Sequence, residues 1–313
     1  MKALVTGGAG FIGSHLSERL LADGAEVVAL DCFTDYYPRP LKERNLEGLS
    51  GRPGYRFVET TIADADLGAL LDGVTHVFHL AAQAGVRKSW GRDFQVYTEL
   101  NVDATQILLE ACVDRPIERV VYASSSSVYG DLVDLPMRED MLPQPVSPYG
   151  VTKLAAEQLC YLYFVNYGVP TVSLRYFTVY GPRQRPDMGF NRFFSAVLDG
   201  RPVLQYGDGL QTRDFTFVAD AAGATATAAV RGVPGRVYNI GGGSRVSLVE
   251  IFDLIGKVSG RPVQIDRQPS QKGDMRDTYA DTSRARADLG FAPGVGLEAG
   301  LAEMFRWMEA TRR

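Results

Sequence analysis

The chain has 313 residues and a hydrophobic content of 45%, which suits one large α/β unit or two lobes of a globular protein. A net charge of −4 and a pI near 5.5 provide no overall positive field for nucleic acid or an anionic membrane. No stretch reaches the roughly 18 apolar residues of a membrane helix, and the first strand begins without room for a secretory signal, so we expect a soluble, cytoplasmic protein.

Short apolar strands alternate with helical patterns through the first half of the chain. Strands are predicted at 2–6, 26–31, 55–60, 76–80, 119–124 and 171–177, and helices at 14–21, 98–113 and 148–165. This alternation predicts an α/β fold with a Rossmann-type, doubly wound parallel sheet. Shorter elements follow at 193–199, 219–230, 248–258 and 297–309. They indicate a smaller lobe over 179–313, with segments near 209–240 returning to the first domain, 1–178.

A glycine-rich loop follows the first predicted strand and opens the first helix. Thr6-Gly7-Gly8-Ala9-Gly10-Phe11-Ile12-Gly13 fits GxxGxxG or GxGxxG, spacings that let the backbone approach a pyrophosphate at a helix N-terminus. Asp31 comes 18 residues after Gly13, where its carboxylate can accept ribose hydroxyls and repel a 2′-phosphate. No Arg or Lys follows immediately, so the sequence favours NAD over NADP. A glycine-rich turn without a ligand is the competing interpretation.

Tyr149 and Lys153 are four residues apart on the predicted helix at 148–165, so they share one face. Ser147 is placed to cap that helix and Pro148 to begin it. A free tyrosine, with a pKa of about 10, is a poor base at neutral pH. A lysine cation, the helix N-terminus and a nicotinamide cation would lower that pKa, and a shift to about 7 requires about 4 kcal/mol. The phenolate could then deprotonate an alcohol as hydride leaves its carbon.

The predicted strand at 119–124 ends in Ser124 and is followed by Ser125, Ser126 and Ser127, at the edge of the sheet where ligands bind in such folds. Ser125 is the candidate to bridge a substrate oxygen and the Tyr149 hydroxyl. A polar turn is the competing interpretation of the serines, as a surface pair is for Tyr149 and Lys153.

With further motifs, these residues give the chain a resemblance to a known family along essentially its whole length. It resembles the extended short-chain dehydrogenase/reductases, in the branch of NAD-dependent nucleotide-sugar epimerases and dehydratases. The motifs are the glycine loop, His79-Leu80-Ala81-Ala82, Asn101-Val102, the serines with Val128-Tyr129-Gly130, Tyr149-xxx-Lys153, Leu174-Arg175-Tyr176-Phe177, Val179-Tyr180-Gly181-Pro182, Gly207-Asp208-Gly209, Arg213-Asp214-Phe215 and Tyr238-Asn239-Ile240-Gly241. The resemblance implies tightly held NAD, a C-terminal nucleotide-sugar lobe, and a homodimer through a four-helix bundle from helices 98–113 and 148–165.

The resemblance also implies the binding residues. NAD would contact Gly7, Gly10, Phe11, Ile12, Gly13, Asp31, Ile62, Leu80, Ala81, Ala82, Asn101, Tyr149, Lys153 and Tyr176. The UDP-sugar would contact Arg87, Ser126, Ser127, Thr178, Arg185, Arg192, Gln205, Tyr206, Arg213 and Arg276, of which Arg192, Arg213 and Arg276 would hold the diphosphate. Thr61 stands where many relatives have an adenine-contacting Asp, and Cys32 where Asn is frequent, so no adenine contact is assigned.

Residue types narrow the reaction. Dehydratase relatives carry Asp-Glu before the Val-Tyr-Gly triplet and decarboxylase relatives a Glu, whereas this chain has Ser126 and Ser127, which favours simple 4-epimerisation. Epimerases of neutral hexoses typically carry the motif Arg-Tyr-Phe-Asn. In this chain the motif reads Arg175-Tyr176-Phe177-Thr178, and the threonine is a similarity to UDP-glucuronate 4-epimerases. The hydroxyls of Ser126, Ser127 and Thr178 would hold the uronate carboxylate, with Arg185 a candidate cation or a structural ion pair.

The predicted function is therefore NAD-dependent 4-epimerisation of UDP-glucuronate to UDP-galacturonate, with Tyr149, Lys153 and Ser125 catalytic. The alternatives are a UDP-glucose or other nucleotide-sugar epimerase, a UDP-glucuronate decarboxylase, and a non-catalytic NAD-sensing regulator, against which the intact Tyr149 and Lys153 argue. We expect no metal and no nucleic acid partner. The histidines (His15, His76, His79) are predicted to be structural, and the cysteines (Cys32, Cys112, Cys160) to be reduced thiols.

Overall fold

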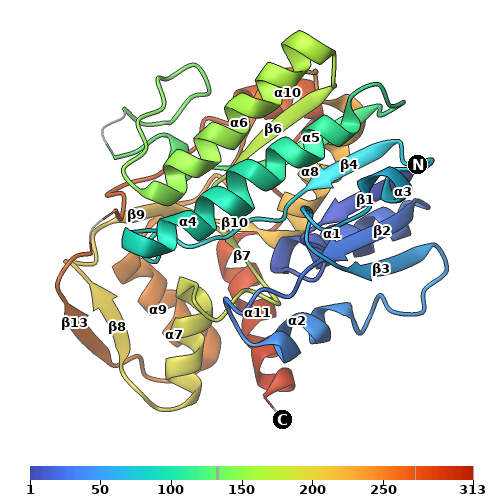
Figure 1. Cartoon of the computed structure of the whole chain (residues 1–313). Coiled ribbons are helices and arrows are strands. Elements are labelled where there is room, and N and C mark those ends of the chain that lie inside the picture. Colours follow the sequence, from blue (N-terminus) through green and yellow to red (C-terminus); the bar gives the residue numbers. More distant parts are fainter. Residues whose placement is uncertain (132–133, 272, 313) are drawn as a thin grey trace.

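Seven parallel strands form the central sheet of this computed structural model, which describes residues 1–131, 134–271 and 273–312 (Figure 1). In spatial order they are β11 (Val237–Ile240), β6 (Thr171–Tyr176), β5 (Arg119–Ser125), β4 (His76–His79), β1 (Lys2–Thr6), β2 (Glu26–Asp31) and β3 (Tyr55–Glu59). The predicted Rossmann-type fold is confirmed. Because the strand order reverses beside β1, the connections that follow β1 and β4 run to opposite faces of the sheet and leave a crevice where ligands bind in such folds.

Helices cover both faces of the sheet, so its strands read as continuous apolar runs. On one face lie α5 (Ala104–Cys112) and α6 (Pro148–Tyr167), and on the other α1 (Phe11–Ala22) and α8 (Val218–Arg231) (Figure 1). Along β1 the side chains alternate between two cores. Ala3 and Val5 join the cluster under α1 and α8, whereas Leu4 joins the one under α5 and α6.

The helical stretch predicted at 98–113 is interrupted. It begins as α4 (Phe94–Tyr97), widens into a π-helical turn at Thr98–Asp103, and continues as α5. A π turn is commonly found at functional sites, and this one carries Asn101. The first helix begins at Phe11, three residues before its predicted start, because Gly10 is its N-cap. The helices α2 (Arg39–Leu46) and α3 (Leu67–Leu70) were not predicted, since neither is long and both lack apolar periodicity.

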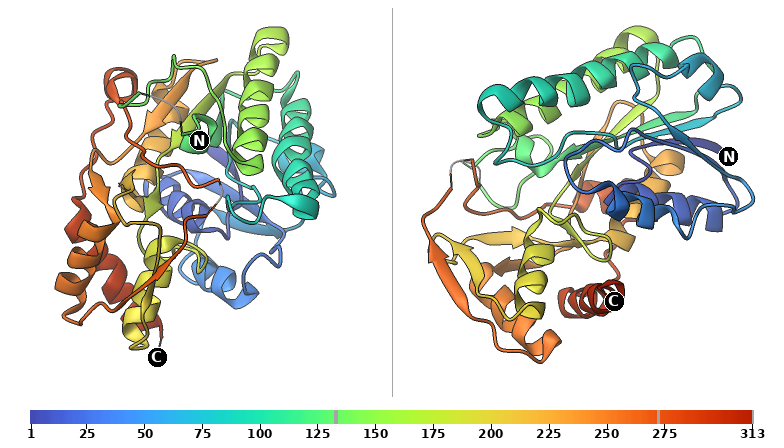
Figure 2. Two further views of the ribbon diagram at one scale, coloured as in Figure 1. Left: turned by 90° about the vertical axis from the view of Figure 1, so that its left-hand side faces the viewer. Right: turned by 60° about the horizontal axis from the view of Figure 1, so that its bottom comes forward.

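The second half of the chain contributes to both parts of the molecule (Figure 2). Three helices, α7 (Gly189–Leu198), α9 (Leu248–Ser259) and α11 (Leu297–Thr311), pack together beside the parallel pair β8 (Val203–Tyr206) and β13 (Ile265–Gln268). The helix predicted at 219–230 is α8, which packs against α1, and β11 pairs with β6 at the sheet edge.

The remaining elements are two short strand pairs and one helix. The strand pairs are the parallel β7 (Val179–Tyr180) and β10 (Thr216–Phe217) and the antiparallel β9 (Thr212–Asp214) and β12 (Arg245–Ser247). The helix is α10 (Ser283–Leu289), which packs against α8 and β11. Within the described residues, no helix has the length and apolarity to cross a membrane.

Candidate active site

The glycine loop between β1 and α1 is packed so closely that side chains cannot enter it. A Cβ on Gly7, whose φ is +72°, would lie 2.8 Å from the backbone nitrogen of Ala81, and one on Gly13 would collide with the Gly7 carbonyl oxygen. Gly10 caps α1 without a side chain, so the first turn of the helix is open to a ligand. This cradle fits the pyrophosphate of a dinucleotide held at a helix N-terminus.

At the end of β2, the Asp31 carboxylate is fixed by its own backbone surroundings. Ala9 N donates to Oδ2 at 3.2 Å and Phe33 N to Oδ1 at 2.9 Å. Burial raises the pKa of Asp31, and Lys42 acts in the opposite direction. Lys42, on α2, donates from Nζ to the Thr34 carbonyl at 2.6 Å and lies near Asp31. Sequence reasoning missed Lys42 because no motif connects it to Asp31.

A pocket of about 1200 Å³, counting solvent at its mouth, runs from Asp31 past the glycine loop to Tyr149 and Lys153. With one exception, every residue predicted to bind NAD lines it. Residues that line the pocket but were predicted to bind neither NAD nor the UDP-sugar are Leu30, Cys32, Thr34, Tyr36, Tyr37, Lys42, Thr60, Thr61, Gln83, Ala84, Leu100, Ala104, Ala123 and Ser124. The Asp35-Tyr36-Tyr37 run could have pointed to the two tyrosines, whereas the backbone-lined positions carry no signal in residue type.

Asn101 is the exception, because its side chain is directed at the protein. It is buried in the π turn, where Oδ1 accepts from Gln83 N at 2.7 Å and Nδ2 donates to the Gln83 carbonyl at 3.0 Å and to Thr152 Oγ1 at 2.9 Å. Thr152 in turn donates to the Tyr149 carbonyl at 2.9 Å. Asn101 therefore holds the Gln83 segment and the start of α6 in place.

Tyr149 and Lys153 face the pocket from α6, which is capped as predicted: Ser147 Oγ accepts from Gly150 N at 3.1 Å. The electrostatics differ from the prediction. Burial raises the pKa of Tyr149, and the groups that oppose this are a hydrogen bond with Ser125 and the charge of Arg185, not Lys153. Burial lowers the pKa of Lys153 to about 7, and its Nζ lies 4.4 Å from the centre of the Tyr122 ring. A lysine with this pKa is only partly charged at neutral pH and therefore lowers a neighbouring pKa less than expected.

The hydroxyl-bearing residues meet at the ends of two adjacent strands. Ser125 on β5 pairs in register with Tyr176 on β6, so Ser126, Ser127 and Thr178 all follow just beyond the same edge. Ser125 Oγ accepts from Ser127 N at 3.1 Å, in a short turn over Ser126–Val128.

Arg185 lies in the pocket wall within electrostatic reach of Tyr149. It also forms a two-point ion pair with Asp187, with Nε to Oδ1 and Nη2 to Oδ2 both at 3.0 Å. The Tyr36 hydroxyl donates to the same Asp187 at 3.2 Å. Both predicted interpretations of Arg185, structural ion pair and active-site cation, are thus compatible with its position.

The remaining predicted sugar-nucleotide residues gather around Tyr206. The guanidinium of Arg87 lies 4.2 Å from the Tyr206 ring centre and that of Arg192 lies 5.9 Å from it. Gln205 is buried and donates to the Gly207 carbonyl at 3.1 Å.

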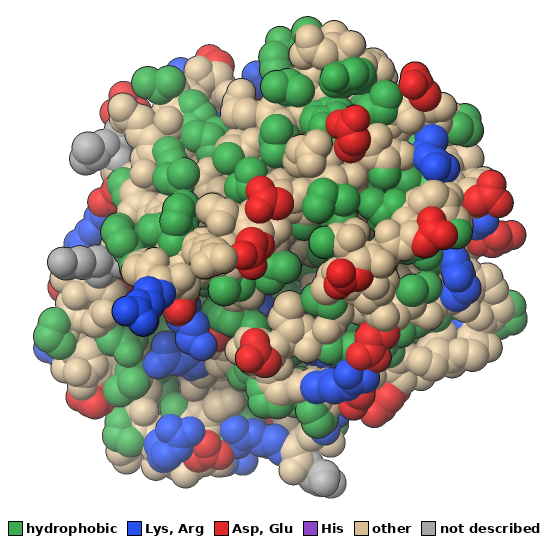
Figure 3. All heavy atoms as spheres, in the orientation of Figure 1, with side chains coloured by type: hydrophobic (Ala, Val, Ile, Leu, Met, Phe, Trp, Pro, Cys, Tyr) green, Lys and Arg blue, Asp and Glu red, His purple; other side chains and the backbone are tan. Residues whose placement is uncertain are grey.

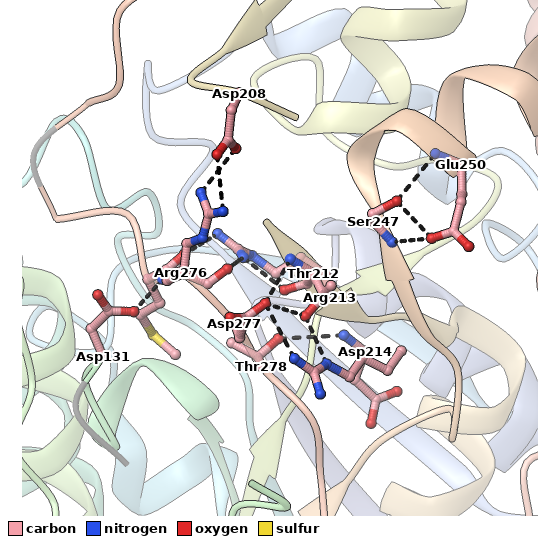
Figure 4. A network of polar contacts seen from close by, with 12 residues as sticks. Asp131, Asp208, Thr212, Arg213, Asp214, Ser247, Glu250, Arg276, Asp277 and Thr278 are labelled. Atoms are coloured by element: carbon pink, nitrogen blue, oxygen red, sulfur yellow. Dashed lines mark hydrogen bonds and ion pairs between the residues drawn. The ribbon is translucent and has the colours of Figure 1, made fainter. Parts of the chain in front are cut away.

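Arg213 and Arg276 are engaged with the protein itself. Arg213 donates to the carbonyls of Met275 at 2.7 Å and Arg276 at 3.1 Å, and Arg276 pairs with Asp208 at 2.9 and 3.0 Å (Figure 4). None of the residues around Tyr206, nor this pair, lines the pocket beside Tyr149.

The histidines make protein contacts. The two ring nitrogens of His79 hydrogen bond with the hydroxyls of Thr6 and Thr105 at 2.8 and 2.9 Å, and burial lowers its pKa to about 3. Over 1–131, 134–271 and 273–312, no group of three or more His, Cys, Asp or Glu side chains is placed to hold a metal ion.

A family profile and two curated relatives match the stretch of the chain that holds the central sheet and the pocket described above. The profile of the NAD dependent epimerase/dehydratase family matches residues 3–241. An uncharacterised UDP-glucose epimerase of Bacillus subtilis is 43% identical over 99% of this chain and 98% of its own. A UDP-glucuronate 4-epimerase of Thermodesulfobacterium geofontis is 36% identical over 97% of this chain and 95% of its own.

A solved structure is similar along the whole chain. The crystal structure of UDP-glucuronic acid 4-epimerase from Bacillus cereus, in complex with UDP-glucuronic acid and NAD, has a TM-score of 0.97 and 43% identity, and covers 99% of this chain and 100% of that one. The glycine cradle, the pocket and the Tyr149–Lys153 pair agree with these likenesses. The chain is a member of the NAD dependent epimerase/dehydratase family, among the extended short-chain dehydrogenase/reductases.

Proposed function

We propose that this protein is an isomerase that converts UDP-glucuronate to UDP-galacturonate by NAD-dependent epimerisation at C4. The observation that carries the proposal is the position of Tyr149 in the glycine-cradled pocket, together with serines, and no carboxylic acid, in the three positions before Val128. The similarity to the Bacillus cereus enzyme, whose structure holds UDP-glucuronic acid and NAD, supports the choice of sugar and cofactor.

The chemistry divides between the cofactor and the chain. Bound NAD supplies the acceptor, and afterwards the donor, of a hydride at C4 of the sugar. Tyr149, as phenolate, takes the proton of the 4-hydroxyl while that carbon is oxidised, and the Ser125 hydroxyl orients the substrate oxygen. Lys153 would hold the nicotinamide ribose from the pocket wall. Once the 4-keto sugar has turned about its diphosphate, Tyr149 returns the proton to O4 and the configuration is inverted.

With a uronate substrate, the enzyme must also prevent loss of the carboxylate as CO₂. Its 4-keto form is a β-keto acid, which loses CO₂ when the bond from C5 to the carboxylate aligns with the carbonyl π system. We propose that the hydroxyls of Ser126, Ser127 and Thr178, which follow the adjoining ends of β5 and β6, anchor the carboxylate away from that alignment. Arg185 would add a positive charge on the same side.

Ser127→Ala and Thr178→Ala are each expected to raise the ratio of UDP-pentose to UDP-galacturonate by about tenfold, because each removes one hydrogen bond to a charged group, worth about 1.5 kcal/mol. Chromatography of the nucleotide sugars measures the ratio. Thr311→Ala, which removes a hydroxyl at the end of α11, is the control and should leave the ratio unchanged. Parental ratios in both site variants would rule out the anchoring role.

A neutral-sugar epimerase is the second candidate, favoured by the name of the Bacillus subtilis relative. Side-by-side product analysis with UDP-glucuronate and UDP-glucose separates the two. We expect UDP-galacturonate as the main product. UDP-galactose formation without any reaction of the uronate would establish the second candidate.

We also propose a homodimer through α5 and α6. The apolar run at 159–164 on α6 is divided: Cys160 and Tyr163 are buried in the core, whereas Tyr161 and Leu162 are exposed, as is nearby Val165. Figure 3 shows hydrophobic side chains along this part of the surface. Exposed apolar patches of this kind are typical of protein interfaces.

Leu162→Glu is expected to weaken the dimer by at least about tenfold in Kd, because a carboxylate would have to be buried in the interface. Light scattering after size-exclusion chromatography measures the mass. Leu142→Glu places the same charge on an exposed leucine outside α5 and α6 and should leave the mass unchanged. A parental dimer in the Leu162 variant would rule out this interface.

The division of the chain into two parts and its location in the cell complete the proposed function. We propose that 1–178, joined by β10, α8 and β11, binds NAD and that the rest of 179–313 binds the nucleotide sugar. A cytoplasmic location would keep Cys32, Cys112 and Cys160 reduced, and all three are free thiols.

A further inference from the structure

One buried carboxylate beside the active site has no part in the proposed chemistry. Glu157 lies on α6 one turn after Lys153 and is only 2% exposed. Its Oε2 accepts from Ser124 Oγ at 2.7 Å and from Arg175 Nε at 3.0 Å, and its Oε1 accepts from Arg175 Nη2 at 2.6 Å. The charged pair formed by Glu157 and Arg175 therefore lies between α6, which carries Tyr149, and the strands β5 and β6, whose ends are followed by Ser126, Ser127 and Thr178.

Stability alone is a weak explanation for this pair. Two charges taken out of water lose hydration that their attraction repays only with excellent geometry, and apolar replacements are often as stable. Arg175 is 3% exposed and stacks over the Tyr129 ring at 4.6 Å, yet its Nη1 has no hydrogen-bond partner in the described part of the chain. The arrangement is thus not optimised as a structural ion pair.

The first effect of Glu157 is to hold strand β5 in position against α6. Ser124 immediately precedes Ser125, and its hydrogen bond to Glu157 ties the end of β5 to α6. Arg175 ties β6, the neighbouring strand, to the same carboxylate. Through these hydrogen bonds, Glu157 fixes the position of Ser125 on β5 relative to Tyr149 on α6.

The second effect is electrostatic. Lys153 is faced by Tyr122 from β5, by His79 from β4 and by Tyr149, Glu157 and Cys160 on its own helix. Of these, Glu157 is the one carboxylate. Burial lowers the pKa of Lys153, and Glu157 counteracts that effect. Arg175 faces Glu157 from the far side, on β6.

We propose that Glu157, held by Arg175 and Ser124, is a positioning residue for the epimerase reaction: it sets the approach of Ser125 to Tyr149 and supplies the negative charge that keeps Lys153 a cation. This inference rests on the proposed function. Glu157 acts through Ser124, Ser125 and Lys153 and does not itself touch the substrate.

Glu157→Gln keeps the shape and a hydrogen-bonding group but removes the charge. We expect kcat for UDP-glucuronate to fall by about tenfold with KM within about twofold, because the alignment of Ser125 with Tyr149 and the charge on Lys153 change while the nucleotide contacts do not. Lys153 loses its cation as pH rises through its pKa, and the variant lowers that pKa. The alkaline limb of the kcat–pH profile should therefore move to lower pH, by about one unit.

Two further variants keep the test decisive if Glu157→Gln does not fold. Glu157→Gln/Arg175→Met leaves no unpaired buried charge and should show the same fall in kcat and a shift of the alkaline limb in the same direction. Ser124→Ala removes the hydrogen bond between β5 and Glu157 but leaves both charges of the ion pair, and it should lower kcat severalfold without moving that limb. Val172→Ala, a buried position on β6 whose side chain packs in the core cluster under α1 and α8, on the face of the sheet opposite α6, shows what lost packing alone does and should keep the parental pH profile.

The outcomes separate the inference from the function on which it rests. A parent protein that does not epimerise UDP-glucuronate would overturn the proposed function. A parent that does, with a folded Glu157 variant retaining the parental kcat and alkaline limb, would overturn the role of Glu157 alone. The same kcat and pH changes in Val172→Ala would also overturn it, since they would reduce the effect to lost packing.

Discussion

Replacing Tyr149 by phenylalanine is expected to lower kcat for UDP-glucuronate epimerisation by about 10²–10⁴-fold, the usual contribution of a positioned acid–base group. The ring should stay in place, since it packs edge-on against Tyr97 with centroids 6.2 Å apart. Only the hydroxyl that exchanges the O4 proton is lost. Steady-state kinetics give kcat, and titration with UDP-glucuronate should show binding within about threefold of the parent, because the nucleotide contacts are untouched.

The control for this variant is Tyr238→Phe, which removes a phenol hydroxyl that is hydrogen bonded to Asp288 at 2.9 Å. That residue lies on β11 and not in the pocket, so kcat should remain at the parental value. If Tyr149→Phe retained a tenth or more of the parental kcat, another group would have to be the acid–base residue.

Gly13→Ala is expected to weaken NAD binding by about 100-fold, equivalent to about 2.7 kcal/mol and within the range for forcing an extra methyl into a tight contact. The new Cβ would collide with the Gly7 carbonyl oxygen and come within 3.1 Å of the Gly8 Cα, so the loop that cradles the pyrophosphate must shift. Calorimetric titration of cofactor-stripped protein with NAD measures the change.

Gly296→Ala is the matched control for the cradle. Gly296 is the N-cap of α11, and a Cβ there would meet no atom within 4 Å. This variant should bind NAD with the parental Kd. Parental affinity in Gly13→Ala would mean that the glycine loop does not hold the pyrophosphate.

Much of the fold and of the cofactor site is predictable from the sequence because the signals are local. Continuous apolar strands, a capped helix starting at Pro148, and glycines at fixed spacing after β1 each depend on neighbours along the chain. The pocket residues Gly7, Gly10, Gly13 and Asp31 were found on that basis and line the pocket together.

What sequence reasoning missed depends on contacts between distant segments. Lys42 enters the pocket from a short helix without apolar periodicity. Asn101 belongs to a family motif, but only the fold shows that its amide is used by Gln83 and Thr152. Burial, which no motif reveals, is the largest influence on the pKa values of both Tyr149 and Lys153. The lowering of the Tyr149 pKa by Lys153, the helix N-terminus and a bound nicotinamide together stays a prediction.

The reaction itself can be followed directly by proton NMR of UDP-glucuronate incubated with the purified protein in D₂O. If C4 is oxidised and reduced by an enclosed hydride carrier, UDP-galacturonate should accumulate to an equilibrium mixture and keep its original proton at C4. Deuterium at C4, or unchanged UDP-glucuronate under conditions in which UDP-glucose becomes UDP-galactose, would contradict the account.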